Sequence, residues 1–254
     1  MTRVFITGSS DGIGLATAKL LADQGHSVVL HARNADRAAS TRRAVPNAAD
    51  VLVADLRSVA ETKALAEQAD ARGPFDAVIH NAGIGYGATS SRETTADGVS
   101  AVFAVNTLAP YLLTCLMARP SARLLYMSSD SHLGGDASLR GAARSHSYSD
   151  SKLHDLMLAK AFGRRWPDLQ VVSMHPGWVR TKMGGSMAPE SLDEAAEALA
   201  GWAVGKGPLA GFASGTIFTC SGRFSEHPGA ADVGKQEELL GICKEVSGVA
   251  IPGE

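Results

Sequence analysis

Apolar residues fall into short runs along the chain, and longer amphipathic segments separate most of these runs. Seven runs are rich in Val, Ile, Leu and Phe, and they cover residues 3–8, 27–32, 50–55, 76–81, 122–128, 169–174 and 215–220. Short continuous apolar runs bounded by Gly, Asp or Ser are typical of strands buried on both faces. We therefore expect each run to form a strand of one sheet.

Helical periodicity fills most of the spaces between these runs. One segment opens at Gly12, carries Ile13, Ala16, Leu20 and Leu21 on one face and stops at Gly25, and similar segments cover about 60–71, 96–117, 148–166, 192–204 and 233–246. Strands that alternate with helices predict a parallel sheet covered on both faces. The pattern indicates an α/β fold with one domain over residues 1–254, a Rossmann-type doubly wound sheet of about seven strands.

Composition narrows the class of partner. The 254 residues are 45% apolar, enough for one sizeable core, and the formal charge of −2 gives no field that would attract nucleic acid or an anionic membrane. Cys115, Cys220 and Cys243 are widely spaced, which favours buried thiols and predicts neither a disulfide framework nor a metal site. The same low charge favours a small, roughly neutral ligand. Because the N-terminus lacks the pattern of a secretory leader, we expect a cytoplasmic protein.

Ligands of such sheets bind beyond the carboxyl ends of the strands, so the residues after each strand are the informative ones. The first strand is followed by "TGSSDGIG", Thr7 to Gly14, which includes Ser10 and Ile13 and leads into a helix. Its glycines, Gly8, Gly12 and Gly14, allow backbone amides to approach a pyrophosphate, although a plain strand-to-helix turn is the alternative. The turn favours a dinucleotide site.

The end of the second strand bears on which dinucleotide binds. An acidic residue there would accept hydrogen bonds from the ribose of NAD(H), but this chain has Ala32 followed by Arg33. A guanidinium can pair with the 2′-phosphate of NADP(H), so NADP(H) is favoured over NAD(H). Arg33 as a solvated surface residue, with Arg37 in its place, remains the alternative.

Candidate cofactor contacts also follow the third and fourth strands. Asp55, with Leu56 after it, could receive the adenine amino group, or it could simply begin the loop. Asn81, Ala82 and Gly83 follow the fourth strand, where small residues let a backbone pass close to a ligand. The neighbouring His80 is more typical of a satisfied polar residue than of a catalyst.

Proton-transfer chemistry is indicated by Tyr148 and Lys152, which are one helical turn apart and project from one helix face. A nearby ammonium stabilises tyrosinate, which makes a tyrosine useful as an acid or as a base. Asn106, a polar residue within a predicted apolar helix, could be a buried structural residue. Ser128 and Ser129 follow the fifth strand, where a turn hydrogen bond is the plain interpretation.

Taken in order, Thr7–Gly8–Gly12–Gly14, Asn81–Ala82–Gly83, Ser129, Tyr148–Lys152 and "HPGWVRT" (His175 to Thr181) resemble the short-chain dehydrogenase/reductase family, with a C-terminal tail similar to retinol-dehydrogenase-like members. The resemblance implies that Ser129 donates to a substrate carbonyl, with Ser128 a minor alternative, and that Tyr148 is the general acid/base. It also implies that Lys152 binds the nicotinamide ribose, and that Asn106 fixes a relay water. The two departures that bear on the cofactor are His80, where relatives often have Asn, and Asp11, where NADP-dependent relatives are often basic.

The resemblance further implies cofactor contacts from Pro176, Gly177, Val179 and Thr181, with the last two holding the nicotinamide carboxamide. Residues 182–205 are then a substrate lid, with Trp178, Met183 and Met187 available for an apolar pocket. The predicted function is an NADP(H)-dependent oxidoreductase of a ketone or aldehyde, or of an alcohol. The alternative is a non-catalytic dinucleotide-binding sensor or scaffold, and a homodimer or homotetramer is possible by analogy.

Overall fold

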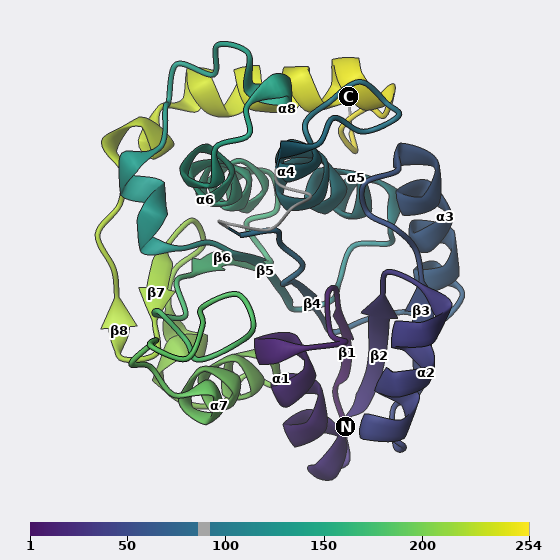
Figure 1. The fold of residues 1–254 in the computed structure, drawn as a ribbon. Helices are drawn as coiled ribbons and strands as arrows, with labels where there is room; N and C mark the ends of the chain where they lie inside the picture. The colour runs from purple at the N-terminus through teal and green to yellow at the C-terminus, as the bar shows by residue number, and fades with distance from the viewer. Residues whose placement is uncertain (86–91, 254) are drawn as a thin grey trace.

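A single eight-stranded sheet organises the chain, and a computed structural model describes it over residues 1–85 and 92–253 (Figure 1). The strand order is β3-β2-β1-β4-β5-β6-β7-β8, with β1 to β7 parallel and β8 antiparallel to β7. Their bounds are β1 Arg3–Ile6, β2 Ser27–Ala32, β3 Asp50–Val53, β4 Ala77–His80, β5 Arg123–Met127, β6 Gln170–Met174, β7 Ile217–Thr219 and β8 Gly222–Arg223. All seven predicted strands are confirmed, and β8 adds a short eighth.

The helices of the described residues follow the predicted order with two differences. They are α1 Gly12–Asp23, α2 Ala35–Ala44, α3 Val59–Asp70, α4 Ala101–Phe103, α5 Ala109–Leu116, α6 Tyr148–Arg165, α7 Leu192–Ala203 and α8 Val233–Ser247, with a π-turn η2 Ala104–Leu108 and 3₁₀ turns η3 Asp130–Gly134, η4 Ala142–Arg144, η5 Pro208–Gly211 and η6 Pro228–Ala231. The sequence pattern missed α2, because only Ala38 and Thr41 of this helix are buried. The helix expected from residue 96 begins at Ala101, since the Ser100 side chain caps it by accepting from Phe103 N.

Helices cover both faces of the sheet, as predicted. On β1, Phe5 packs into the core beneath α3, α5 and α6, whereas Val4 and Ile6 face the core shared with α1 and α7. In Figure 1, α5 and α6 lie on one side of the sheet and α1 and α7 on the other, while α8 lies outside α6. Because successive side chains of each strand point to opposite faces of the sheet, they pack into two separate cores.

The segment expected to act as a lid contains two different structures. Residues 182–191 form turns, whereas α7 buries Leu199 and Trp202 completely in the core. A helix anchored in this way is part of the framework, and the lid itself stays a prediction. None of the described helices is both long enough and apolar enough to span a bilayer.

Candidate active site

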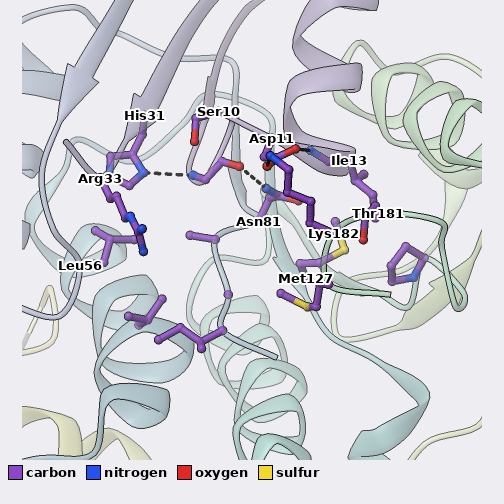
Figure 2. A pocket seen from close by; sticks show the side chains of 18 of the residues that line it. Ser10, Asp11, Ile13, His31, Arg33, Leu56, Asn81, Met127, Thr181 and Lys182 are labelled. Atoms are coloured by element: carbon purple, nitrogen blue, oxygen red, sulfur yellow. Dashed lines mark hydrogen bonds and ion pairs between the residues drawn. The ribbon is translucent and has the colours of Figure 1, made fainter. Parts of the chain in front are cut away.

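A cavity of about 380 Å³ opens at the carboxyl ends of the parallel strands (Figure 2). Most of the predicted cofactor residues line it. They are Gly8, Ser10, Gly12, Ile13, Arg33, Asp55, Leu56, Asn81, Ala82, Gly83, Tyr148, Lys152, Pro176 and Thr181. Arg33 and Leu56 lie at one side of the view in Figure 2, with Met127 and Thr181 at the other. The cavity thus runs from the end of β2 to the start of the predicted lid.

The first turn approaches β4 closely and is locked by a buried histidine. Gly8 has φ +62°, and a Cβ on it would lie 2.6 Å from the Ala82 Cα, so the position requires glycine. Gly8 N donates to His31 Nδ1 at 3.0 Å, which leaves His31 Nε2 to donate to the Ala54 carbonyl at 2.9 Å. A ring nitrogen that accepts the bond from Gly8 N carries no proton, so the ring is neutral, and burial lowers the pKa of His31. His31 was not predicted as part of the site, because its only signal in the sequence is that of a polar residue within an apolar strand.

Asn81 joins the turn to the end of β4. Its Nδ2 donates to Thr7 O at 2.9 Å and to Gly8 O at 3.1 Å. A Cβ on Gly14 would lie 2.4 Å from that nitrogen. Gly14 was predicted as a cofactor contact, but it is not among the described residues that line the cavity. The structure shows that it makes room for Asn81.

Asp11 connects the glycine-rich turn to the segment after β6. Its carboxylate accepts from Gly12 N at 2.9 Å and from Lys182 Nζ at 2.6 Å, and it lies 3.8 Å from Arg37 Nη2. Partial burial raises the pKa of Asp11, but the hydrogen bonds from Lys182 and Gly12 outweigh it and lower the pKa below its ordinary value. Asp11 is therefore a helix cap neutralised by basic neighbours.

Three guanidinium groups line the end of the cavity near β2 and β3: Arg33, Arg37 and Arg57. Arg33 is exposed, and Arg37 Nη1 donates to Ser10 Oγ at 3.0 Å. Arg57 N donates to Asp55 Oδ1 at 3.0 Å, and its side-chain Nε and Nη2 donate to Oδ2 of the same carboxylate. Asp55 therefore organises the loop after β3, the second of the two roles considered for it, and its adenine contact stays a prediction.

His80 is the last residue of β4, and it is not among the described residues that line the cavity. Its Nε2 is 3.0 Å from Thr114 Oγ1, and its ring centroid is 5.1 Å from that of Tyr126. Burial lowers the pKa of His80 to about 3, so the ring is neutral. The departure from asparagine at this position therefore changes core packing, and Asn81 makes the contacts to the glycine-rich turn.

The helix α6 carries the predicted acid/base pair. Ser147 caps it by accepting from Asp150 N, and Tyr148 begins it. Lys152 is 3% exposed, and its Nζ lies 5.4 Å from the Tyr148 ring centroid. Burial by itself would lower the pKa of Lys152, but Asp155 and Tyr148 outweigh it and raise the pKa. The buried ammonium stays charged beside the phenol.

Asn106 lies in the π-turn η2 and closes the inner side of the site. Its Oδ1 accepts from Ile84 N at 2.8 Å, and its Nδ2 donates to Ile84 O at 3.1 Å and to Ser151 Oγ at 2.9 Å. A Cβ on Gly83 would lie 3.6 Å from both Asn106 Oδ1 and Lys152 Nζ. Single π-turns often occur at functional sites. The side chain is a buried hydrogen-bonding hub, and Lys152 lies close to it.

The two serines after β5 have different surroundings. Ser128 lines the cavity, but it is buried and its Oγ donates to the Lys152 carbonyl at 2.7 Å. Ser129 is half-buried, caps η3 and donates from Oγ to Asp130 Oδ1 at 2.8 Å. The Ser128 hydroxyl is used in a buried hydrogen bond to α6, whereas the Ser129 hydroxyl bonds a side chain at the surface and is easier to redirect toward a substrate. Ser129 is not among the described residues that line the cavity.

The turn after β6 holds the remaining predicted contacts. Thr181 lines the cavity beside Gly12, and its Oγ1 accepts from Gly184 N at 3.1 Å. Gly177 has φ +90° and packs against Glu190, while Val179 is buried and bridges to Glu190. Gly177 and Val179 shape this turn, whereas Pro176 and Thr181 reach the cavity wall.

Known proteins resemble this chain over most or all of its length. The family described as short chain dehydrogenase matches residues 2–191. An uncharacterized oxidoreductase of Emericella nidulans is 72% identical over 254 residues, which covers all of both chains. A short-chain dehydrogenase of Penicillium rubens is 39% identical over 99% of this chain and all of its own.

Solved structures share the fold at low identity. The NADPH-bound carbonyl reductase from chicken fatty liver superposes with a TM-score of 0.69 at 24% identity, over 89% of this chain and 99% of its own. The match to the family, spread over the glycine-rich turn, β5 and α6, decides the assignment. The chain belongs to the short-chain dehydrogenase family of oxidoreductases.

Proposed function

We propose that the protein is an NADP(H)-dependent oxidoreductase that interconverts a ketone or aldehyde and an alcohol. One observation carries the proposal: Tyr148 and the buried Lys152 line the same cavity as the glycine-rich turn. A cavity with dinucleotide-type contacts along its length and an acid/base pair beside them suits hydride transfer coupled to proton transfer.

The cavity fits a nicotinamide dinucleotide. Gly8 and Gly12 both have positive φ, and added side chains would meet Ala82 and Thr181 respectively, so backbone can approach a pyrophosphate there. Arg33 and Arg37, with Arg57 nearby, bring positive charge to the end of β2, where the 2′-phosphate of NADP(H) would lie. The NADPH bound by the chicken carbonyl reductase supports the same cofactor here.

Each of the predicted catalytic residues has a part in the proposed reaction. When bound, NADP(H) supplies or accepts the hydride. In reduction, Tyr148 gives the proton to the substrate oxygen, and Ser129 donates a hydrogen bond that orients the carbonyl. Lys152 stabilises the tyrosinate left behind and binds the nicotinamide ribose, while Asn106 keeps the Lys152 side of the site ordered through Ile84 and Ser151.

The segment 182–191 is the substrate-facing cover in this proposal. Met183 lines the cavity and lies against Gly85, where an added Cβ would be 2.6 Å from the Met183 Sδ. Trp178, Met183 and Met187 are 56%, 53% and 83% exposed, which is unusual for such large apolar side chains. They favour a substrate with an apolar body.

Turnover tests the proposal directly. Benzaldehyde, acetophenone, cyclohexanone and long-chain alkyl aldehydes and ketones are offered with NADPH, and its loss is followed by absorbance. The wild type should consume NADPH with at least one carbonyl, and Tyr148→Phe should lose the activity by a factor of about 100 or more. Equal slow consumption by both proteins would refute catalysis and favour the sensor or scaffold alternative, which needs neither Tyr148 nor Lys152.

The preference for NADP(H) has its own test. Arg33→Ala should weaken NADPH binding by a factor of about 10 and leave NADH binding nearly unchanged, because only NADPH carries the 2′-phosphate. Arg42→Ala is the matched control, since Arg42 lies on α2 but pairs with Asp50 outside the cavity. Equal losses for the two cofactors would remove the basis for the preference.

A further inference from the structure

A buried carboxylate lies directly behind the proposed catalytic lysine. Asp155 is 2% exposed, and its Oδ2 accepts from Lys152 Nζ at 2.9 Å. The same ammonium donates to the Met127 carbonyl at 2.6 Å. Tyr148, Lys152 and Asp155 are spaced four and three residues apart on α6, so they lie along one face of the helix. The pair is therefore continuous with the acid/base site.

Asp155 is itself held in place from the sheet. Ser173 on β6 donates from its Oγ to the Asp155 carbonyl at 3.3 Å. Ser128 on β5 donates to the carbonyl of Lys152 at 2.7 Å. Hydrogen bonds from two strands thus fix the backbone that carries both charged groups, about one helical turn (Lys152) and two helical turns (Asp155) beyond Tyr148.

The charged and titratable neighbours of the pair are few. Tyr148 interacts electrostatically with Lys152, and Tyr126 of β5 interacts electrostatically with Asp155. Tyr126 interacts in turn with Cys115 of α5 and Cys243 of α8. The ranges of β6, α4, η2 and η6 contain no titratable residue, and η3 adds Asp130 and His132. In the part of the chain described, Asp155 is the carboxylate in salt-bridge contact with Lys152.

Asp155 supplies the negative charge that compensates the buried Lys152 ammonium. Burial raises the pKa of Asp155 to about 7, and the Lys152 ammonium opposes that rise. An ammonium removed from water and left without a partner tends to release its proton. Without Asp155, the carbonyl of Met127 and the more distant Tyr148 would have to compensate the charge of Lys152 alone.

We propose that Asp155 is a positioning residue, which keeps the buried Lys152 protonated and aligned beside Tyr148. The inference rests on the proposed function for its catalytic consequence, but the charge state of Lys152 can be measured without turnover. Ser173→Ala supplies a matched control, because it removes a hydrogen bond to the same backbone and leaves the carboxylate.

The first measurement is an NMR titration of the full chain carrying ¹³Cε-lysine, with the Lys152 signal assigned from its loss in Lys152→Arg. Asp155→Asn should lower the pKa of Lys152 by about one unit or more, while Ser173→Ala should leave it within a few tenths of a unit of the wild-type value. An unchanged pKa of Lys152 in Asp155→Asn overturns the proposal.

The second measurement is the pH profile of NADPH-dependent carbonyl reduction. In Asp155→Asn, kcat should fall about tenfold with little change in the KM for the carbonyl, and the alkaline loss of activity should begin at lower pH. Asp155→Glu, which keeps the charge, should recover part of the rate. If no carbonyl is turned over by the wild type but the pKa of Lys152 falls as stated, the proposed function fails and the role of Asp155 stands.

A double variant tests the proposal in the case where Asp155→Asn does not fold. Should Asp155→Asn fail to fold, Lys152→Met/Asp155→Asn is compared with it by circular dichroism. Recovery of the fold supports the proposal, because the defect then came from the unpaired ammonium. Failure of the double variant to fold overturns it, because Asp155 would then be needed for packing independently of Lys152.

Discussion

Replacing Gly14 by alanine sets two physical effects against each other. Gly14 lies in the first turn of α1 with ordinary helical backbone, so helix propensity alone predicts that alanine stabilises the fold by up to about 1 kcal/mol. Its Cβ, however, would lie 2.4 Å from Asn81 Nδ2 and 2.8 Å from Gly8 O. The Asn81 amide must therefore move.

The cost of that movement can be estimated from its contacts. Asn81 Nδ2 donates to Thr7 O and Gly8 O, and each bond is worth about 1 kcal/mol. Forcing a methyl group into a packed site adds roughly 1–3 kcal/mol. After the gain in propensity, Gly14→Ala should lower the free energy of unfolding by about 2–4 kcal/mol.

Gly241→Ala is the matched control, because Gly241 lies within α8 and an added Cβ there meets nothing within 4 Å. Urea denaturation followed by circular dichroism should show Gly241→Ala more stable than wild type by about 0.5–1 kcal/mol. Gly14→Ala should also bind NADPH more weakly, because the turn that faces the pyrophosphate shifts. A neutral or stabilising Gly14→Ala would refute the assigned packing of Asn81.

Three further substitutions test other parts of the fold. Hydrogen bonds from Arg165 and Arg164 lower the pKa of Glu237 to about 2, so Glu237→Gln should cost up to about 1 kcal/mol at neutral pH, discounted because this carboxylate is 41% exposed. That cost is present above the ordinary pKa of 4.5 and should disappear in urea titrations as the pH falls toward 2. Lys182→Ala removes an ion pair whose lysine is 80% exposed. Thermal unfolding should therefore show a loss of less than about 1 kcal/mol in the free energy of unfolding, and a smaller loss in high salt. Trp202→Ala empties a fully buried site and should cost about 3–5 kcal/mol in urea, a loss that a surface position would not show.

The strands and most helices were predictable because burial on both faces leaves a strong apolar signal. Every predicted strand is present, from Arg3–Ile6 through Ile217–Thr219. The helix α2 was missed because its composition is almost wholly polar and its stability comes from Asn34, whose side chain accepts from Arg37 N. Periodicity cannot detect a helix that buries so little.

Local sequence also located the candidate site but not its supports. Tyr148 and Lys152 were found from a four-residue spacing, whereas Asp155 looked like one more residue of an amphipathic helix. Ser151 belongs to the same group, since it lies beside Lys152 in the sequence and is buried against Asn106. His31 likewise gave no sign that it would accept a hydrogen bond from Gly8 N, in the turn after β1. Contacts in the folded chain decide these roles: Asp155 pairs with Lys152 across one turn of α6, whereas Ser151 and His31 contact segments distant in sequence.

Transfer of deuterium from NADPH that carries deuterium at both C4 positions of the nicotinamide tests the central claim most directly. The carbonyl compound reduced fastest in the panel is incubated with the labelled cofactor, and the alcohol is analysed by mass spectrometry. The account predicts one deuterium on the carbinol carbon with the wild type and almost none with Tyr148→Phe in the same time. An unlabelled alcohol, or equal labelling by both proteins, would contradict it.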